Sequence, residues 1–331
     1  MRVIGLGLIA GLALAWTAGT AAAQEAKLRV VSAFPKQLIF SQDLAKFVEA
    51  FNKSAEAKGV AQIQYVGGPE VTPVEGQGTA IKNGVFDLLL TPTAYTLGVI
   101  PEGDALLGSN VTPAQARANG GYAALNKIWN ERLNANIVAW WAPGVGFHMY
   151  LNEMPKLNAK GQPDLAGVKI RSTPIYKEWL ETMGATNVMM QAGEVYTALE
   201  RKVVDGFCWP GVGAMDLGWH KFVKARISPP VWQLEVILLA NKTKWDRLPQ
   251  RAREVLSTAF LNYETEALQR YTQAGIDETE ALRKAGVQIV DLKGDAGKEY
   301  VRNAYEITWK RVKERAPANA DNLRKLLYVQ N

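Results

Sequence analysis

Residues Val168–Pro174 read V-K-I-R-S-T-P, a short strand that turns into a helix. Its first four residues predict the strand. Ser172 and Thr173 suit a helix N-cap, and the proline suits the first position of a helix that runs to Met183. Arg171 is therefore expected where free N–H groups and a partial positive charge gather. A guanidinium there favours a carboxylate, whose two oxygens match its fork; a surface arginine at a strand end is the alternative.

Strand and helix patterns alternate on both sides of this stretch. Strands are predicted over Leu28–Ala33 and Ala61–Val66, with the helix Ser41–Ser54 between them. Another helix is predicted over Gln77–Asn83, followed by an apolar strand over Val85–Leu90. This alternation predicts an α/β fold.

One helix-and-strand unit occurs twice. Thr79–Pro92 reads T-A-I-K-N-G-V-F-D-L-L-L-T-P, and Thr197–Pro210 reads T-A-L-E-R-K-V-V-D-G-F-C-W-P, so the two align without a gap. In open α/β sheets, ligands bind beyond the carboxyl ends of strands. With one unit in each of two lobes, Thr91–Thr93 and Cys208–Pro210 would face each other across a cleft.

The length of the chain, 331 residues, suits two lobes. We expect lobe I to comprise residues 24–147 with about 236–272, and lobe II residues 148–235 with about 273–331. Gly144–Asn152 and Val231–Asn241 are the candidate hinge strands. The helical pattern of Trp245–Lys284 is long enough to brace both lobes, and it could also form a dimer face.

The first residues have the pattern of a secretory signal peptide. Arg2 precedes the apolar run Val3–Trp16, and small residues lead to a cleavage site after Ala23. A membrane anchor is the weaker alternative, because the run is rich in glycine and alanine and lacks an aromatic or basic belt. We predict a signal peptide over residues 1–23 and export to the periplasm.

Charge and cysteine content exclude several classes of protein. The formal charge of +6 falls to +5 without Arg2, and the basic residues are scattered, so no nucleic-acid partner is predicted. Cys208 is the only cysteine and cannot form an internal disulfide.

Motifs of enzymes and metal sites are missing from the sequence. The two histidines, His148 and His220, form no H-x-x-x-H pair, and there is no C-x-x-C, G-x-S-x-G or phosphate-binding glycine loop. We predict no metal and no cofactor. A thiol site that uses Cys208 and His148 is the enzymatic alternative, although a buried inert cysteine is more usual.

Candidate ligand contacts cluster near the predicted strand ends. Trp209 ends the strand of the second repeat, and with Arg171 it would supply the apolar wall and the aimed charge of a small-molecule site. Phe147, His148 and Tyr150 lie in one predicted hinge strand and are further candidates, with core packing as the alternative.

Three acidic residues and one threonine lie at other predicted turns and strand ends. Glu70 follows a Gly-Gly-Pro break and could accept a hydrogen bond from a ligand, or it could be a solvated loop carboxylate. Thr91 lies at the end of the first repeat strand. Asp87 and Asp205 occupy matching places in the two repeats, where a turn-stabilising role is favoured.

Four segments give the chain a family resemblance. They are Tyr65–Val71 (Y-V-G-G-P-E-V), Gly84–Asp87 (G-V-F-D), Val168–Arg171 (V-K-I-R) and Gly193–Gly206 (G-E-V-Y-T-A-L-E-R-K-V-V-D-G). With these, nearly the whole chain after the signal peptide resembles the solute-binding proteins of tripartite ATP-independent periplasmic (TRAP) transporters, of the dicarboxylate-binding-protein type.

The resemblance implies a two-lobed periplasmic-binding-protein fold, no catalysis, and an integral-membrane permease as partner. It also implies that Arg171 pairs with the ligand carboxylate and that Trp209 contacts the ligand. Phe147 or His148 stands where many members have a second arginine. Cys208 stands where some keto-acid binders have a metal-binding glutamate, and a thiol is a poor ligand for hard cations.

The sequence thus predicts a periplasmic protein, monomer or homodimer, that captures a small carboxylate with an apolar or aromatic part and delivers it to a TRAP permease. Two alternatives stay open. One is a periplasmic enzyme that acts on a carboxylate through Cys208 and His148. The other is a sensor whose closed state meets a membrane receptor.

Overall fold

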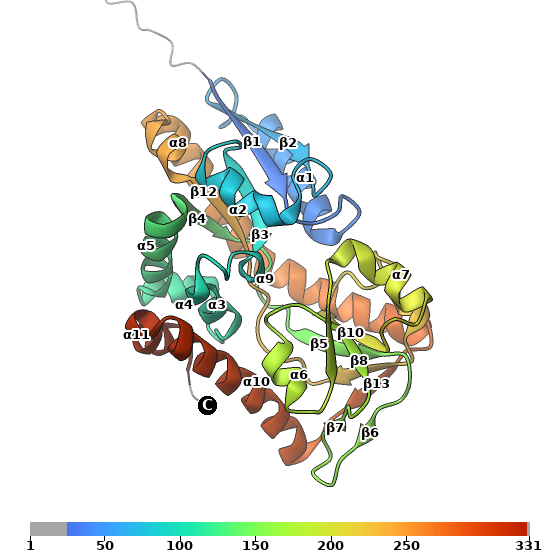
Figure 1. Cartoon of the computed structure of the whole chain (residues 1–331). Helices are drawn as coiled ribbons and strands as arrows, with labels where there is room; N and C mark the ends of the chain where they lie inside the picture. The colour runs from blue at the N-terminus through green and yellow to red at the C-terminus, as the bar shows by residue number, and fades with distance from the viewer. Residues whose placement is uncertain (1–24, 330–331) are drawn as a thin grey trace, which may run out of the picture.

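A computed structural model describes residues 25–329, so the signal peptide predicted over residues 1–23 lies outside the described residues. Two separate β-sheets, each flanked by helices, make up the molecule (Figure 1). The first sheet has, in spatial order, β2 (Ala61–Gly67), β1 (Ala26–Ser32), β3 (Leu88–Pro92), β12 (Val236–Asn241) and β4 (Ala135–Trp140).

The second sheet lies beside the first and is built mainly from the middle of the chain. Its order is β13 (Gln288–Asp291), β11 (Ala225–Ser228), β5 (Phe147–Leu151), β10 (Gly206–Pro210), β8 (Lys169–Ser172) and β9 (Thr186–Met189). A two-stranded sheet, β6 (Lys156–Leu157) with β7 (Pro163–Asp164), extends from it. The predicted α/β fold with two lobes is confirmed.

Most helices belong to one lobe. Those near the first sheet are α1 (Ile39–Lys53), α2 (Val74–Lys82), α3 (Asp104–Leu107), α4 (Pro113–Ala118), α5 (Gly121–Leu133) and α8 (Lys242–Arg247). Those near the second are α6 (Lys177–Glu181) and α7 (Val195–Glu200). Single turns of 3₁₀ helix occur at η1 (Thr93–Tyr95), η2 (Pro101–Gly103), η3 (Ala192–Glu194) and η4 (Trp219–Phe222).

Two extended segments cross between the lobes side by side. One joins β4 to β5 and the other joins β11 to β12. They are paired by a bridge between Phe147 and Val231 and by a hydrogen bond of 2.7 Å from the Leu234 amide to the Val145 carbonyl. The two predicted hinge segments therefore lie next to each other.

Helix α9 (Gln250–Lys284) spans both lobes, as predicted. Its 35 residues extend about 52 Å at 1.5 Å per residue, and it contacts β4 and β2 of the first sheet and β13 of the second. It also packs closely on a crossing segment. Gly144 there has φ of +82°, and a Cβ at that position would lie 2.6 Å from the side chain of Leu268.

The last two helices return to the first lobe. Helix α10 (Gly294–Arg315) contacts α3 and α6, and α11 (Pro317–Leu327) contacts α3 and α5. Trp309 and Leu323 from these helices are buried in the hydrophobic core that contains Trp129 and Trp140 of the first lobe. This packing ties residues beyond 300 to α3 and α5, whereas the sequence placed them with lobe II. The lobe boundaries stay a prediction.

The internal repeat has a structural counterpart. In the first lobe the Asp87 carboxylate accepts a hydrogen bond of 2.7 Å from the Arg29 amide, and the Asp87 amide donates to the Arg29 carbonyl. In the second, Asp205 makes the same pair of bonds with Lys169, at 2.9 and 2.7 Å. Each aspartate thus joins the turn before its strand to a neighbouring parallel strand, the turn-stabilising role favoured for it.

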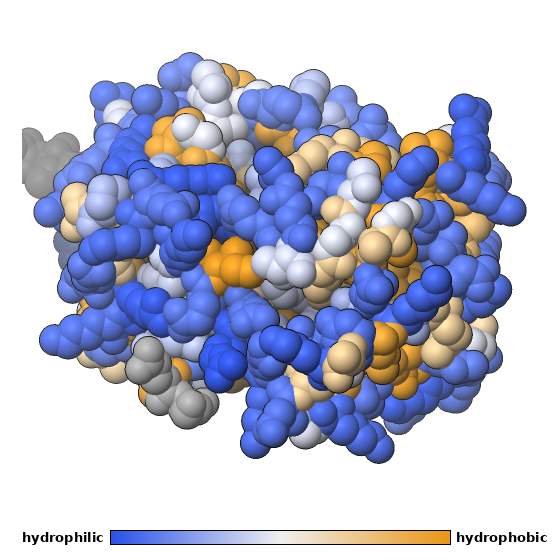
Figure 2. Space-filling model, turned by 60° about the horizontal axis from the view of Figure 1, so that its bottom comes forward, coloured by the Kyte–Doolittle hydropathy of each residue, from blue (hydrophilic) through white to orange (hydrophobic). Residues whose placement is uncertain are grey.

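The face of the molecule in Figure 2 is mostly hydrophilic. The face in Figure 2 carries hydrophobic side chains in several separate groups among polar residues. Within residues 25–329, no helix combines the length and the apolar character that a membrane span requires.

A buried ion pair joins α10 to both lobes. Arg311 is 2 % exposed and lies 2.5 Å from the carboxylates of Asp104 in α3 and Glu178 in α6. Asp104 is also buried, and burial raises the pKa of its carboxyl while Arg311 opposes that rise. A buried charge that loses its partner is strongly destabilising.

Arg311→Ala should therefore lower the free energy of unfolding by about 3–5 kcal/mol. The matched control is Lys310→Ala, whose exposed pair with Glu314 at 3.8 Å should contribute at most about 1 kcal/mol. Urea denaturation measures both. Equal losses in the two variants would contradict a structural role for the Arg311 pair.

Candidate functional site

A cavity lies between the two lobes at the carboxyl ends of their strands. Its volume is about 40 Å³. Pro92 and Pro210, the last residues of the two repeats, both line it, so the repeats meet at one site as predicted. The lining residues are Phe34, Phe40, Pro92, Ala94, Tyr95, Phe147, Arg171, Thr173, Ile175, Tyr176, Trp209, Pro210, Leu234 and Glu235.

Arg171 is the central charged group of this cavity. It lies in β8, between the parallel neighbours β10 and β9, and is completely buried. Its Nε and Nη2 donate to the Met190 carbonyl at 3.2 and 2.9 Å, and its Nη1 donates to the Cys208 carbonyl at 3.3 Å. The backbone of both neighbouring strands therefore fixes the guanidinium plane.

Two N–H groups of Arg171 have no hydrogen-bond acceptor among the described residues. A guanidinium has five N–H donors, and the three bonds to carbonyls leave one on Nη1 and one on Nη2 among the described residues. Burial lowers the pKa of Arg171 from its ordinary value, although arginine stays protonated. The cavity thus holds a cation with two donors and without a carboxylate partner within residues 25–329.

Trp209 lies next to this cation. Its ring centre is 5.4 Å from the Arg171 guanidinium carbon, within the range of a cation–π contact. The indole Nε1 donates to the Val212 carbonyl at 3.1 Å, and the ring packs edge-on against Trp219. The predicted pairing of Arg171 with Trp209 is present in the geometry of the cavity.

The three candidates in β5 face two directions, because side chains alternate along a strand. Phe147 lines the cavity. His148 lines a different cavity beside α9, where its Nδ1 lies 2.8 Å from the Ile227 carbonyl. Burial, with the nearby Arg226, lowers the pKa of His148 to about 3, so its ring is neutral. Tyr150 donates to the Pro210 carbonyl and stacks on Phe207 without lining the site.

The structure does not bring Glu70 or Thr91 to the cavity either. The Glu70 carboxylate accepts a hydrogen bond of 3.0 Å from the Gly68 amide and lies 3.1 Å from Lys36. The Gly68 amide is the main reason that the pKa of Glu70 lies below its ordinary value. Thr91 is buried and donates to the Pro92 carbonyl. These contacts are those of a turn and a strand end.

The turn after Arg171 differs from the sequence prediction. Ser172 is the last residue of β8, and the helix predicted from the proline onward begins only at Lys177, as the short α6. The Tyr176 amide donates to the Thr173 carbonyl, so a tight turn occupies the intervening residues. Helix α6 has no side-chain N-cap. The site around Arg171 is therefore built from strand carbonyls and side chains.

Sequence reasoning missed several cavity residues, of which Tyr95, Thr173, Tyr176 and Glu235 are polar. Tyr95 follows β3 and Tyr176 precedes α6, in segments without a motif. Glu235 is the single acidic residue in the apolar run Val231–Ala240. An isolated acid in such a run is a signal that could have been noticed, because buried carboxyl groups need a partner.

Glu235 is 1 % exposed, and its Oε2 has no hydrogen-bond partner among the described residues. Burial raises the pKa of Glu235 to about 8. The Asp104 charge adds to this rise, and the backbone amides of Glu235 and Ala94 oppose it. At pH 7 the carboxyl group is therefore mostly protonated.

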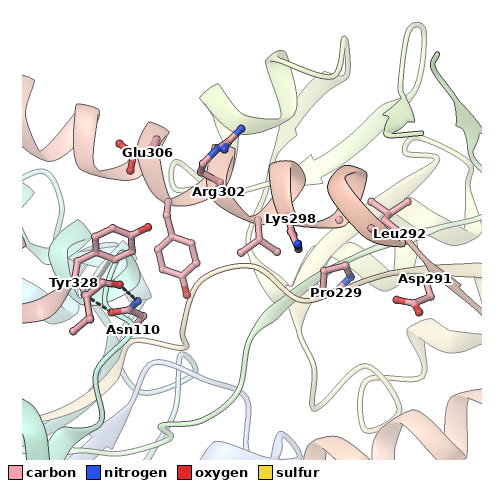
Figure 3. A pocket seen from close by; sticks show the side chains of 13 residues that line it. Asn110, Pro229, Asp291, Leu292, Lys298, Arg302, Glu306 and Tyr328 are labelled. Atoms are coloured by element: carbon pink, nitrogen blue, oxygen red, sulfur yellow. Dashed lines mark hydrogen bonds between the residues drawn. The ribbon is translucent and has the colours of Figure 1, made fainter. Parts of the chain in front are cut away.

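A larger hollow lies elsewhere on the described part of the chain. It has a volume of about 940 Å³ and is a surface groove along α10, next to Pro229 and Asn110 (Figure 3). Lys298, Arg302 and Glu306 lie along it, and all three are solvent-exposed. Solvated charges of both signs offer no aimed polar group, so the small buried cavity around Arg171 is the better candidate.

The family of the chain is shown by a comparison with known families. Residues 36–315 match the model of the bacterial extracellular solute-binding protein family 7. The chain belongs to this family, and the resemblance predicted from the four sequence segments is confirmed.

Individual relatives are distant but cover the chain. It is 23 % identical to a solute-binding protein of Albidiferax ferrireducens, over 87 % of each protein. It is 26 % identical to a monocarboxylate 2-oxoacid-binding periplasmic protein of Nostoc, over 88 % of this chain and 80 % of that one. The crystal structure of DctP7, a Bordetella pertussis extracytoplasmic solute receptor binding pyroglutamic acid, has a TM-score of 0.78 at 16 % identity, covering 92 % of this chain and 99 % of that one.

The raised pKa of Glu235 predicts a pH dependence of stability. In the unfolded chain the carboxyl ionises near its ordinary pKa of 4.5, and in the folded protein it ionises near 8. Between these values the unfolded state binds fewer protons, so this group makes folding less favourable as pH rises. Relative to Glu235→Gln, the free energy of unfolding of the wild type should fall by about 1.4 kcal/mol per pH unit within this window.

Denaturant titrations of both proteins from pH 5 to pH 9 measure this difference. The comparison cancels the titration of the groups that the two proteins share. Parallel curves would show that Glu235 ionises normally in the folded state.

Proposed function

We propose that the protein captures a small organic acid in the cavity between its lobes and delivers it to a TRAP-type permease in the membrane. The single observation that carries the proposal is Arg171, a completely buried cation with two N–H donors left over in a cavity between two lobes. A carboxylate supplies two oxygens and one negative charge, which match those donors and that charge.

The energetics of burial support this assignment. A charge removed from water is costly unless it is paired and hydrogen-bonded. Two backbone carbonyls only partly compensate Arg171, and Trp209 adds a cation–π contact. A bound carboxylate would balance the charge of Arg171 and accept hydrogen bonds from its two remaining N–H groups. The folded protein therefore favours binding of an anion at this place.

Two of the relatives agree in ligand chemistry. The Nostoc protein is described as binding 2-oxoacid monocarboxylates, and DctP7 as binding pyroglutamic acid. Both are carboxylates. We therefore assign a carboxylate ligand to this chain as well.

Loading the cavity requires movement. Arg171 is completely buried and Glu235 is 1 % exposed, so an acid that reaches them from solvent needs the lobes to separate. The hydrogen bonds between the lobes include one from Gln191 to Glu75 at 3.0 Å and one from the Ile39 amide to Asp216 at 3.1 Å. A ligand that contacts both lobes binds the closed form more tightly and shifts the population toward it.

A binding role without catalysis is the proposal for this site. Cys208 is 1 % exposed, and burial raises the pKa of its thiol far above the ordinary value. A nucleophilic cysteine needs thiolate character and access. His148 lines a separate cavity and is neutral. This geometry does not favour the enzymatic alternative.

The remaining parts of the proposal concern location and partners. Membership of an extracellular solute-binding family agrees with export, and we keep cleavage after Ala23 and residence in the periplasm as predictions. Transport through a permease is preferred to sensing because the resemblance is to the TRAP family. Monomer or homodimer, and the absence of a metal, of a cofactor and of a nucleic-acid partner, also stay predictions.

Arg171→Ala should weaken the binding of any ligand acid by about 30-fold or more. Removing one partner of a desolvated charged pair costs about 2–5 kcal/mol, and about 1.4 kcal/mol is tenfold. A thermal-shift screen of mono- and dicarboxylates identifies the acids, since each ligand raises the Tm by mass action. Isothermal titration calorimetry then measures both proteins.

Lys169→Ala is the matched control. Lys169 is a cation in the same strand, but it is exposed and outside the cavity. Its replacement should change the affinity less than about twofold. Unchanged affinity in Arg171→Ala would show that Arg171 does not bind the ligand carboxylate, which contradicts the proposal.

Delivery to a permease predicts a transport defect. In cells that lack this gene, uptake of the radiolabelled acid should fall and return with the wild-type gene. The Arg171→Ala gene should not restore uptake at acid concentrations below the weakened Kd, although the protein is exported in equal amount. Normal uptake without the gene, together with an altered transcriptional response to the acid, would favour the sensor.

A further inference from the structure

We infer that Glu235 is the second polar contact of the ligand, and that the ligand is a monocarboxylate with an uncharged polar group, a carbonyl, hydroxyl or ring amide, on an apolar body. The inference rests on the proposed function, in which Arg171 holds the carboxylate. It adds to the ligand site a residue from the lobe opposite Arg171, and it narrows the ligand from carboxylates in general to monocarboxylates with an uncharged polar group.

Glu235 and Arg171 approach the cavity from different lobes. Arg171 belongs to β8 of the second sheet, and Glu235 directly precedes β12 of the first. Both line the cavity, and no ion pair joins them within residues 25–329. The hydroxyls of Tyr95 and Tyr176 lie within electrostatic reach of both groups. A ligand placed between Arg171 and Glu235 would therefore bridge the lobes.

One oxygen of the Glu235 carboxyl group, Oε2, lacks a hydrogen-bond partner among the described residues. A buried polar atom without a hydrogen bond costs about 1–3 kcal/mol, and Oε2 is such an atom. Its neighbours in the fold are the η1 turn, with the Ala94 amide, and the crossing segment to which it belongs. Since Ala94 and Glu235 both line the cavity, a polar ligand group there can supply the missing bond.

The number of charges limits the ligand to one carboxylate. Arg171 is the only arginine, lysine or histidine among the lining residues of this described cavity. A second carboxylate would lie near Glu235, without a cation to balance it. Because burial keeps Glu235 mostly protonated at pH 7, its O–H can instead donate to a carbonyl or hydroxyl oxygen.

Aromatic walls define the rest of the ligand. Six of the lining side chains are aromatic, so the part of the ligand between its polar ends should be apolar. They are Phe34, Phe40, Tyr95, Phe147, Tyr176 and Trp209.

Matched pairs of acids test the inference by isothermal titration calorimetry. Pyroglutamate is compared with cyclopentanecarboxylate, and phenyllactate with 3-phenylpropionate, so that each pair differs in the neutral polar group. Succinate represents the dicarboxylates. Wild-type protein should bind the polar member of at least one pair about tenfold or more tightly than its partner, the effect of one satisfied buried hydrogen bond, and more tightly than succinate.

Two variants of Glu235 assign the effect to this residue. In Glu235→Leu, the polar acid of the pair should bind less than about threefold more tightly than its apolar partner. Weak binding that depends on Arg171 should remain. Glu235→Gln keeps a neutral donor of similar shape and should retain most of the preference. Leu removes a buried acid whose Oε2 has no partner among the described residues, so the Tm at pH 7 should not fall, and this measurement confirms folding.

A pH series provides a second readout. Ionised Glu235 repels an anion, so wild-type affinity for the polar acid should fall between pH 7 and pH 9, and that of Glu235→Gln should not. The other titratable or charged groups near Glu235 are Asp104, Arg171, Tyr95 and Tyr176, and both proteins share them.

The possible failures are distinguishable. If Glu235→Leu keeps the wild-type preference while Arg171→Ala loses binding, the inference is wrong and the proposed function stands. If Arg171→Ala binds like the wild type, the proposed function fails. Tighter binding of succinate than of every monocarboxylate, or no preference within either pair, overturns the inference.

Discussion

The candidate site depends on one buried cation and on how the backbone holds it. Arg171 extends from the middle of three parallel strands, β10, β8 and β9, whose carboxyl ends lie at the same edge of the sheet. The carbonyls of Cys208 and Met190, one from each side, hold the guanidinium. Its orientation is thus fixed by hydrogen bonds that belong to the architecture of the sheet. The remaining donors are presented to the cavity already oriented, which lowers the entropic cost of binding.

The two repeats explain why the cavity forms where it does. Asp87 and Asp205 each clamp the turn before a strand to a neighbouring parallel strand, in one lobe and in the other. The strands that follow end in Pro92 and Pro210, which cannot donate a hydrogen bond to continue a ladder. Each lobe therefore ends its strand at an equivalent point, and the two ends face the same space.

Local patterns predicted much of this arrangement, because they depend on neighbouring residues. The strands, the long helix, the repeats and the pairing of Arg171 with Trp209 follow from such patterns. Alternation along β5 could also have separated Phe147 from His148. The return of α11 to α5, and the meeting of Glu235 with Arg171, depend on contacts between segments far apart in the chain. Sequence spacing carries no information on such contacts, although an isolated acid in an apolar run indicates an unusual environment.

In the proposed function, closure and binding are linked by the polar groups that closure would bury. When the lobes met, Arg171 would lose water without gaining a carboxylate from the described residues, and Glu235 would lose water while Oε2 gained no partner. Both costs oppose the closed form of the protein alone. A ligand that offers a carboxylate to one group and a neutral polar group to the other removes both costs at once. The free energy of the two contacts then appears as preference for the closed form, so a partner that recognises closure detects the acid indirectly.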